Sequence, residues 1–226
     1  MMRMRSVALA ALVVLLVSGA AWAQAAAGPP PASTPAPPAT STAAAEKAWA
    51  FSASAATYVL PDEPDFVQPS FSADRGWLHL EGRFNYEDRG TGSAWFGYNL
   101  GVGETVRLEF TPMIGAVFGN TDGIAPGYKG SLAWRMLQLY SETEFVIDPG
   151  DSGNNFLYTW SEFEVAPVEW CRFGFVVQRT KVYKTEFDIQ RGFFVGAAYK
   201  GATVTAYVFD PDASRPTVVV AVGVGF

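Results

Sequence analysis

The chain has 226 residues, with 16 Lys and Arg against 22 Asp and Glu and a formal net charge of −6. Loss of an N-terminal signal that carries Arg3 and Arg5 leaves 14 basic and 22 acidic residues, a net charge of −8. This balance excludes nucleic acid as an expected partner, because polyanions bind basic surfaces. The one cysteine, Cys171, cannot form an internal disulfide, so the fold is held without covalent links between strands.

Residues 1–23 have the pattern of a secretory signal peptide. Arg3 and Arg5 precede an apolar run from Val7 to Val17, and Ala21-Trp22-Ala23 supplies small residues for cleavage after Ala23. The run is shorter than the roughly 20 apolar residues that a membrane-spanning helix needs, which argues against a permanent anchor. The sequence therefore predicts an exported protein.

Residues 24–46 form a second segment that is rich in Ala, Pro, Ser and Thr. The segment has no charge and no large side chain except near its ends. It cannot bury enough apolar area to offset its conformational entropy. We expect a disordered periplasmic tail that acts as a spacer, and a Pro-rich ligand or cell-wall contact is the alternative.

From residue 47 to residue 226 the chain consists of short segments in which apolar and polar residues alternate. No window sustains a helical period, and turn residues separate the segments. The predicted strands are 47–58, 67–74, 76–87, 91–101, 104–118, 127–134, 136–147, 155–166, 169–182, 188–200, 202–210 and 216–226. Short and long connections alternate between them, as in outer-membrane barrels with short periplasmic turns and longer external loops. An even strand number places both termini in the periplasm.

Aromatic residues gather at both ends of the predicted strands. Those at the short-turn end are Trp49, Trp77, Trp134, Trp170, Tyr199 and Phe226, and those at the long-loop end are Tyr58, Tyr86, Phe118, Tyr128, Phe156, Tyr183 and Phe209. Two belts of this kind are typical of a barrel with lipid around it, because aromatic rings favour both bilayer interfaces. A soluble β-sandwich has no reason to sort aromatic residues by strand end.

Charged residues indicate which face of each strand turns inward. In 104–118, Leu108 and Phe110 share one face, while Arg107 and Glu109 share the other. A Lys or Arg that faces lipid near the midplane costs about 2 to 4 kcal/mol, so the charged face must line the lumen. The residues predicted to line it are His79, Glu81, Arg83, Arg107, Glu109, Lys129, Glu142, Glu144, Glu162, Glu164 and Arg172.

The final segment, 217–226, has one bulky and one small face. The bulky face consists of Val218, Val220, Val222, Val224 and Phe226. A terminal strand that ends on an aromatic residue resembles the C-terminal strand of bacterial outer-membrane β-barrel proteins, where it closes the barrel and is read by the assembly machinery. The resemblance covers roughly residues 46–226 and extends to the class alone. It implies a closed antiparallel up-and-down transmembrane β-barrel in the outer membrane of a Gram-negative-type bacterium, with lipids and the barrel-assembly machinery as partners.

Three functions are compatible with such a barrel. The first is a narrow channel for small solutes or cations, because twelve strands enclose more space than the eight that side chains alone fill, and the lumen has an acidic excess. The second is a non-conducting structural or interaction barrel in which the lumen charges form ion pairs. The third is an outer-membrane enzyme, but the only histidine, His79, has no nucleophile motif beside it. We therefore expect neither catalysis nor a cofactor.

Two acidic groups are candidates for a divalent cation. Glu142-x-Glu144 and Glu162-x-Glu164 place carboxylates on the lumen face, and 148–155 is an acidic, Gly-rich loop. Carboxylate oxygens are suitable ligands for Ca²⁺, but the loop lacks the full ligand spacing. A solvated acidic wall and a simple turn are the preferred interpretations, so we predict no metal site. Cys171 is expected to act as a small apolar residue on the lipid face.

Overall fold

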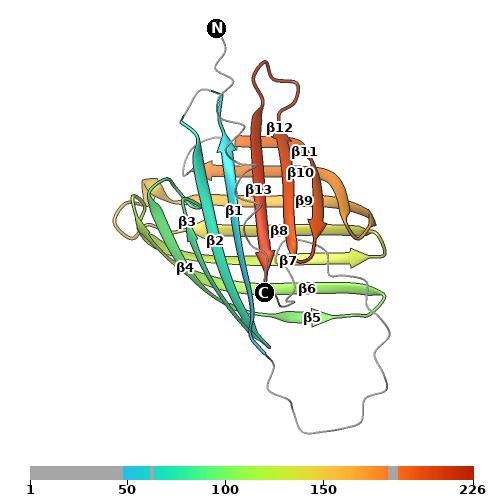
Figure 1. Ribbon diagram of the computed structural model, residues 1–226. Coiled ribbons are helices and arrows are strands. Elements are labelled where there is room, and N and C mark those ends of the chain that lie inside the picture. Colours follow the sequence, from blue (N-terminus) through green and yellow to red (C-terminus); the bar gives the residue numbers. More distant parts are fainter. Residues whose placement is uncertain (1–47, 62–63, 183–187) are drawn as a thin grey trace.

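The computed structural model describes residues 48–61, 64–182 and 188–226. They form one antiparallel sheet (Figure 1). Its strands are β1 (Ala50–Val59), β2 (Phe66–Arg75), β3 (Leu78–Phe84), β4 (Thr91–Tyr98), β5 (Leu100–Val102), β6 (Val106–Gly119), β7 (Gly123–Trp134), β8 (Leu137–Val146), β9 (Phe156–Val168), β10 (Cys171–Val182), β11 (Asp188–Tyr199), β12 (Ala202–Phe209) and β13 (Thr217–Gly225). A 3-10 helix, η2 (Ser152–Asn154), lies between β8 and β9. The predicted signal peptide and tail, 1–23 and 24–46, lie outside the described residues.

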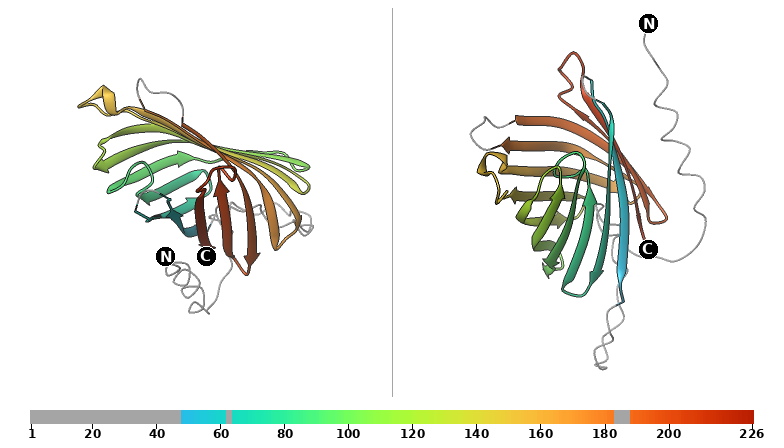
Figure 2. Two further views of the ribbon diagram at one scale, coloured as in Figure 1. Left: turned by 90° about the horizontal axis from the view of Figure 1, so that it is seen from above. Right: turned by 90° about the vertical axis from the view of Figure 1, so that its left-hand side faces the viewer.

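The sheet closes on itself because its first strand pairs with its last. β1 pairs with β2 on one side and with β13 on the other, in a register that runs from Ser52↔Gly225 to Val59↔Val218. β4 and β5 both pair with β6, so they form one strand that is interrupted at Asn99. The result is the closed barrel of twelve strands that the sequence predicts (Figure 2).

The last residue of the chain takes part in this closure. The backbone N–H of Phe226 donates to the Phe51 carbonyl, and that of Phe51 donates to the Phe226 carbonyl, each at 2.9 Å. The two rings stack with their centroids 5.8 Å apart. Both ends of the barrel segment therefore meet at one seam, which joins the predicted closing strand to β1.

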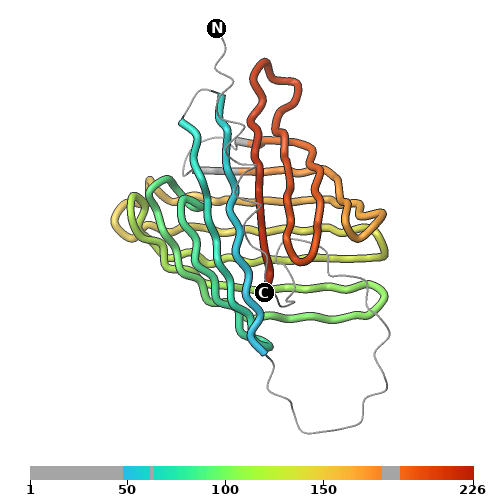
Figure 3. The backbone as a smooth tube through the Cα atoms, in the orientation of Figure 1, coloured from blue at the N-terminus to red at the C-terminus, as the bar shows by residue number. Residues whose placement is uncertain are grey.

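With β4 and β5 counted as one strand, consecutive strands are neighbours throughout the barrel, so the chain follows a simple meander (Figure 3). Turns of two or three residues follow β2, β5, β7, β9 and β11, and they define the short-turn end, where β13 also ends. The connections after β1, β3, β6, β8, β10 and β12 define the long-loop end, although the one after β6 also has only three residues. Within the described residues, no helix is long and apolar enough to span a bilayer.

Most strand boundaries differ from the predicted ones by one to four residues, and two of the differences have a clear physical reason. β7 begins at Gly123 rather than at 127, and its ladder with β6 continues through Pro126, which pairs with Ile114. Gly and Pro are turn signals when the sequence is read alone, but here the neighbouring strands fix the conformation. β3 ends at Phe84 rather than at 87, because Asn85 adopts a left-handed backbone with φ of 57°.

The outward face of the barrel is apolar over its whole circumference. On β6, Leu108, Ile114 and Phe118 are exposed, whereas the intervening Met113 and Val117 are buried. The same alternation leaves Phe175, Phe193 and other large apolar side chains of the remaining strands exposed. An apolar surface of this extent is stable against hydrocarbon rather than against water.

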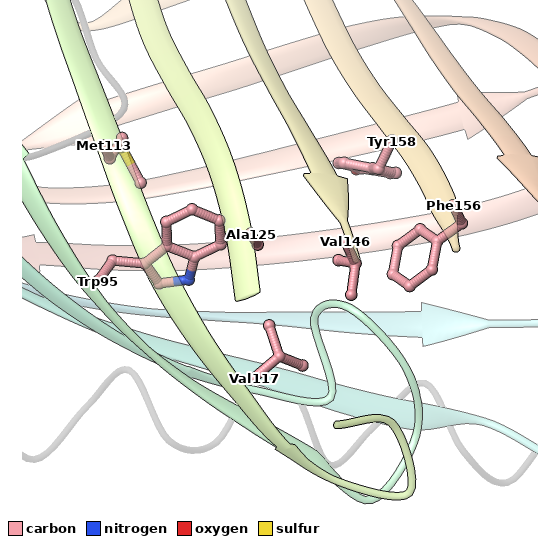
Figure 4. Close-up of a cluster of buried hydrophobic side chains, with 7 residues drawn as sticks. All are labelled: Trp95, Met113, Val117, Ala125, Val146, Phe156 and Tyr158. Atoms are coloured by element: carbon pink, nitrogen blue, oxygen red, sulfur yellow. The ribbon is translucent and has the colours of Figure 1, made fainter. Parts of the chain in front are cut away.

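The lumen near the long-loop end is packed with apolar side chains. One buried cluster joins residues from β4, β6, β7, β8 and β9 (Figure 4), and its members are Trp95, Met113, Val117, Ala125, Val146, Phe156 and Tyr158. A second cluster consists of Tyr58, Val176, Phe194, Tyr207, Phe209 and Val219. Gly115 leaves room for the indole of Trp95, because a Cβ atom at residue 115 would lie 2.6 Å from the ring.

These clusters correct part of the predicted aromatic belt at the long-loop end. Tyr58, Phe156 and Phe209 are buried inside the barrel instead of facing outward, and Phe209 has no exposed surface. Tyr86 also turns inward, because the left-handed Asn85 interrupts the strand alternation just before it. Phe118 lies on the outside as expected, and Tyr183 lies outside the described residues.

The outward face yields a test of lipid contact. Ile114→Arg places a charge near the middle of β6, and it should lower the free energy of unfolding in lipid vesicles by about 2 to 4 kcal/mol. Val106→Arg, at the short-turn end of the same strand, should lower it by about 1 kcal/mol or less. Chemical denaturation of both variants measures the difference. Equal losses at the two positions would contradict a bilayer centred on the barrel.

Candidate functional site

The predicted lumen residues fall into two interior networks and one separate pair. His79, Arg83, Glu142, Glu144, Glu162, Glu164 and Arg172 are buried, and the side chains of Glu81 and Lys129 are 6% and 23% exposed. Arg107 and Glu109 stand apart from them at the short-turn end. Their side chains are 49% and 43% exposed, and they pair with each other at 2.6 Å.

Arg83 on β3 is the centre of the first network. Its guanidinium contacts Glu81 at 3.1 Å and both Glu142 and Glu144 of β8 at 3.0 Å, while its side chain is only 1% exposed. The same group lies over the rings of Tyr86 and Trp95, with its carbon 4.3 and 4.7 Å from their centroids. Arg83 therefore compensates three carboxylates that would otherwise be costly to bury, and Lys129 assists at two of them, 2.6 Å from Glu81 and 4.0 Å from Glu142.

The first network extends from Arg83 toward the short-turn end. Glu81 accepts from Lys129 at 2.6 Å, and its oxygen lies 3.3 Å from Nε2 of His79. Nδ1 of His79 lies 2.8 Å from Asp74, to which Asn99 also donates at 2.7 Å. His79 is thus held between two carboxylates, and the chain of polar contacts links β2, β3 and β7 with Asn99, which lies between β4 and β5.

The second network lies on β9, β10 and β12. Arg172 contacts Glu164 at 3.1 Å and donates to Thr205 at 2.5 Å. Gly196 lies opposite Arg172, and a Cβ at this position would be 2.7 Å from the guanidinium. Glu162 is held differently, because its Oε1 accepts from Trp160 Nε1 at 2.8 Å and from the Tyr207 hydroxyl at 2.9 Å.

Two cavities adjoin inside the barrel. The larger has a volume of about 410 Å³ and extends from Asp74, Asn99 and Glu109 to an aromatic layer. The smaller, of about 210 Å³, extends from that layer to Asp88 and Arg89 near the long-loop end. The residues that line both cavities are Tyr58, Gln68, Tyr86 and Tyr158. We call these four residues the constriction.

The constriction is fixed by contacts to the first network. The hydroxyl of Tyr86 donates to Glu142 at 2.6 Å, and its ring meets that of Tyr158 edge-on with centroids 5.6 Å apart. Tyr58 stacks on Phe66 at 4.7 Å. Sequence reasoning missed this layer, because it assigned Tyr58 and Tyr86 to the outer belt. The pairing of Tyr86 with Glu142 depends on strands far apart in the chain, so no local pattern could have revealed it.

The acidic loop after β8 forms a turn with its own side chains. Asp148 accepts from the Asn154 side chain at 2.9 Å and from the backbone N–H groups of Gly150 and Asp151 at 2.7 and 3.1 Å. These hydrogen bonds, led by that of Asn154, hold the pKa of the Asp148 carboxyl below its ordinary value. Across the described residues, no group of three or more His, Cys, Asp or Glu side chains is arranged to hold a metal ion.

Comparison with known proteins relates the chain to porins by fold. No family model and no curated protein sequence matches it. Among solved structures, KdgM porin matches with a TM-score of 0.55 and 10% identity, covering 77% of this chain and 99% of the porin. This chain has the fold of the outer-membrane β-barrels. KdgM porin in complex with disordered oligogalacturonate matches with a TM-score of 0.54 and 9% identity over the same shares.

The Arg83 contacts predict that two arginines of this barrel differ strongly in their contribution to stability. Arg83→Met leaves three buried carboxylates without their shared cation, and it should lower the free energy of unfolding by about 3 to 5 kcal/mol. Arg107→Met, which breaks a half-exposed pair, should lower it by about 1 kcal/mol or less. Denaturant titration in detergent or lipid compares the two. Similar losses would show that Arg83 does not hold the lumen together.

Proposed function

We propose that this protein is an outer-membrane channel of narrow bore that passes small solutes or cations. The adjoining cavities of about 410 and 210 Å³, which succeed each other along the lumen, carry the proposal. Twelve strands enclose more space than an eight-stranded barrel and less than an open porin of sixteen or more, so a narrow path is the expected result. Both termini would lie in the periplasm, on the same side of the membrane as the short turns.

The charge of the lumen favours cations and neutral solutes. The wall of the larger cavity has six acidic side chains, Asp74, Glu81, Glu109, Glu142, Glu162 and Glu164, against Lys129, Arg172 and His79. One of the similar porin structures holds oligogalacturonate, which is an anionic sugar chain. An acidic wall repels such a chain and attracts cations, so we propose a different class of solute for this barrel.

A closed interaction barrel is the second candidate, and the packing of the long-loop half favours it. Arg83 is almost fully buried, and the two apolar clusters together with the constriction fill the lumen at that level. Under this hypothesis the ion pairs are structural, and the loops contact a partner. An enzyme remains the least supported function, because both ring nitrogens of His79 face carboxylates rather than a hydroxyl group.

The outer-membrane location also defines two sets of partners that we propose. Lipid would contact the outward side chains of the closing strand, including Val224 and Phe226, which are 40% and 48% exposed. The barrel-assembly machinery would read this strand before Phe226 pairs with Phe51. Both assignments follow from the resemblance of the terminal strand to those of other outer-membrane barrels.

Reconstitution into planar bilayers tests conduction and its selectivity. The wild-type barrel should give discrete conductance steps, with a reversal potential in a KCl gradient that indicates preference for K⁺. The double variant Glu109→Gln and Glu162→Gln removes two carboxylates of the larger cavity and should shift the reversal potential toward zero. Glu169→Gln, in a turn outside the cavity, is the control for net charge and should leave it unchanged. A folded wild-type protein that stays silent would contradict the channel.

The constriction predicts which residues limit the current. Tyr58→Ala with Tyr158→Ala removes two of its rings and should join the cavities, so the single-channel conductance should rise. Phe118→Ala removes an outward aromatic side chain near the same end and should leave the conductance unchanged. An unchanged conductance in the double tyrosine variant would place the limiting step elsewhere. A silent wild type that begins to conduct only in this variant would support the closed barrel instead.

A further inference from the structure

One buried carboxylate of the lumen differs from the others in its partners. Glu142 and Glu144 contact Arg83, and Glu164 contacts Arg172. Glu162 is buried to a similar degree, with 9% of its surface exposed, yet within the described residues no ion pair includes it. Arg172 makes its direct contact with Glu164 and acts on Glu162 only from a longer distance. Burying a carboxylate without a cation in direct contact costs free energy, and a cationic ligand in the adjoining cavity would lower that cost.

Aromatic rings surround this carboxylate. Trp160 and Tyr207 donate to its Oε1, and their rings meet edge-on with centroids 5.3 Å apart. Tyr140 lies opposite Glu162 in the register of β8 and β9. All four side chains line the larger cavity, together with Tyr158. A carboxylate and several Trp and Tyr rings on the wall of one cavity suit an ammonium group, because the carboxylate balances its charge and ring faces attract cations.

We propose that the larger cavity is a binding site for a small organic cation, such as a quaternary ammonium compound, centred on Glu162. The carboxylate would balance the charge, while Trp160 and Tyr207 contact the apolar substituents around the nitrogen. This proposal specifies the class of solute that the proposed channel would pass. It rests on the channel function, because a permeating solute must enter this cavity. The cavity volume of about 410 Å³ lies within the range of ~300 to 1,000 Å³ that small-molecule sites occupy.

An inorganic ion fits this place less well than an organic one. Divalent ions require several oxygen ligands around one point, and no such group exists among the side chains that the structure describes. Glu164, the nearest carboxylate along β9, is already paired with Arg172, and the groups in direct contact with Glu162 are the side chains of Trp160 and Tyr207. The aromatic surroundings therefore select an ion that has both charge and apolar surface.

Calorimetric titration of the purified protein in detergent with choline chloride tests the site. The wild type should show saturable binding that sodium chloride of equal ionic strength does not reproduce. Glu162→Gln keeps the size of the side chain and removes its charge, and it should weaken binding by about tenfold or more. Trp160→Phe keeps a ring with a weaker attraction for cations and should weaken it by about threefold. Glu169→Gln, outside the cavity, should bind choline like the wild type.

Folding of each variant is checked by heat-dependent migration on gels and by circular dichroism, so a loss of binding in a folded variant is interpretable. Saturable binding that Glu162→Gln leaves unchanged would overturn the site, as would the absence of binding to the folded wild type. Bilayer recordings test the channel hypothesis separately from the binding site. A barrel that conducts but does not bind choline overturns the site alone, whereas one that binds choline without conducting supports the site and contradicts the channel.

Discussion

Closure of the sheet through the β1–β13 pair is the constraint on which the other features of this protein depend. Hydrocarbon offers no hydrogen bonds, so a membrane-spanning sheet must satisfy every backbone group internally and leave no free edge. The ladder from Ser52↔Gly225 to Val59↔Val218 meets this requirement, and the mutual hydrogen bonds of Phe51 and Phe226 extend it to the last residue. Once the sheet is closed, the two-residue period of each strand gives the barrel an outer and an inner face.

The inner face then has to accommodate charges that the outer face excludes. Arg83 does so by contacting Glu81, Glu142 and Glu144, and Arg172 does so by contacting Glu164. Two apolar clusters occupy much of the long-loop half of the lumen, and the larger cavity lies on the short-turn side of the constriction. Both functional hypotheses depend on this arrangement, because side chains that stabilise the interior also separate the two cavities.

The sequence predicts the strand number and the position of most charged side chains, because alternation and the cost of charge in lipid act within single strands. It does not predict which charges meet, since Arg83 and Glu144 are brought together by the arrangement of distant strands. It misplaces Tyr58 and Phe209, because an aromatic ring near a strand end suits both the bilayer interface and a packed lumen. It also misplaces Tyr86, whose orientation depends on the left-handed backbone of Asn85. Glu162 and Glu164 are equivalent in the sequence, and only the structure shows that one has an arginine partner and the other has aromatic donors.

Nuclear magnetic resonance of the protein in detergent micelles tests closure most directly. Ala55 of β1 and Val222 of β13 are register partners across the closing seam, and Phe96 of β4 and Ile114 of β6 are partners in a pair of neighbouring strands within the meander. A closed barrel predicts nuclear Overhauser contacts across both pairs and slow amide exchange in β1 and β13. Contacts across the β4–β6 pair alone, with rapid exchange of the β1 and β13 amides, would show an open sheet and contradict the closed barrel.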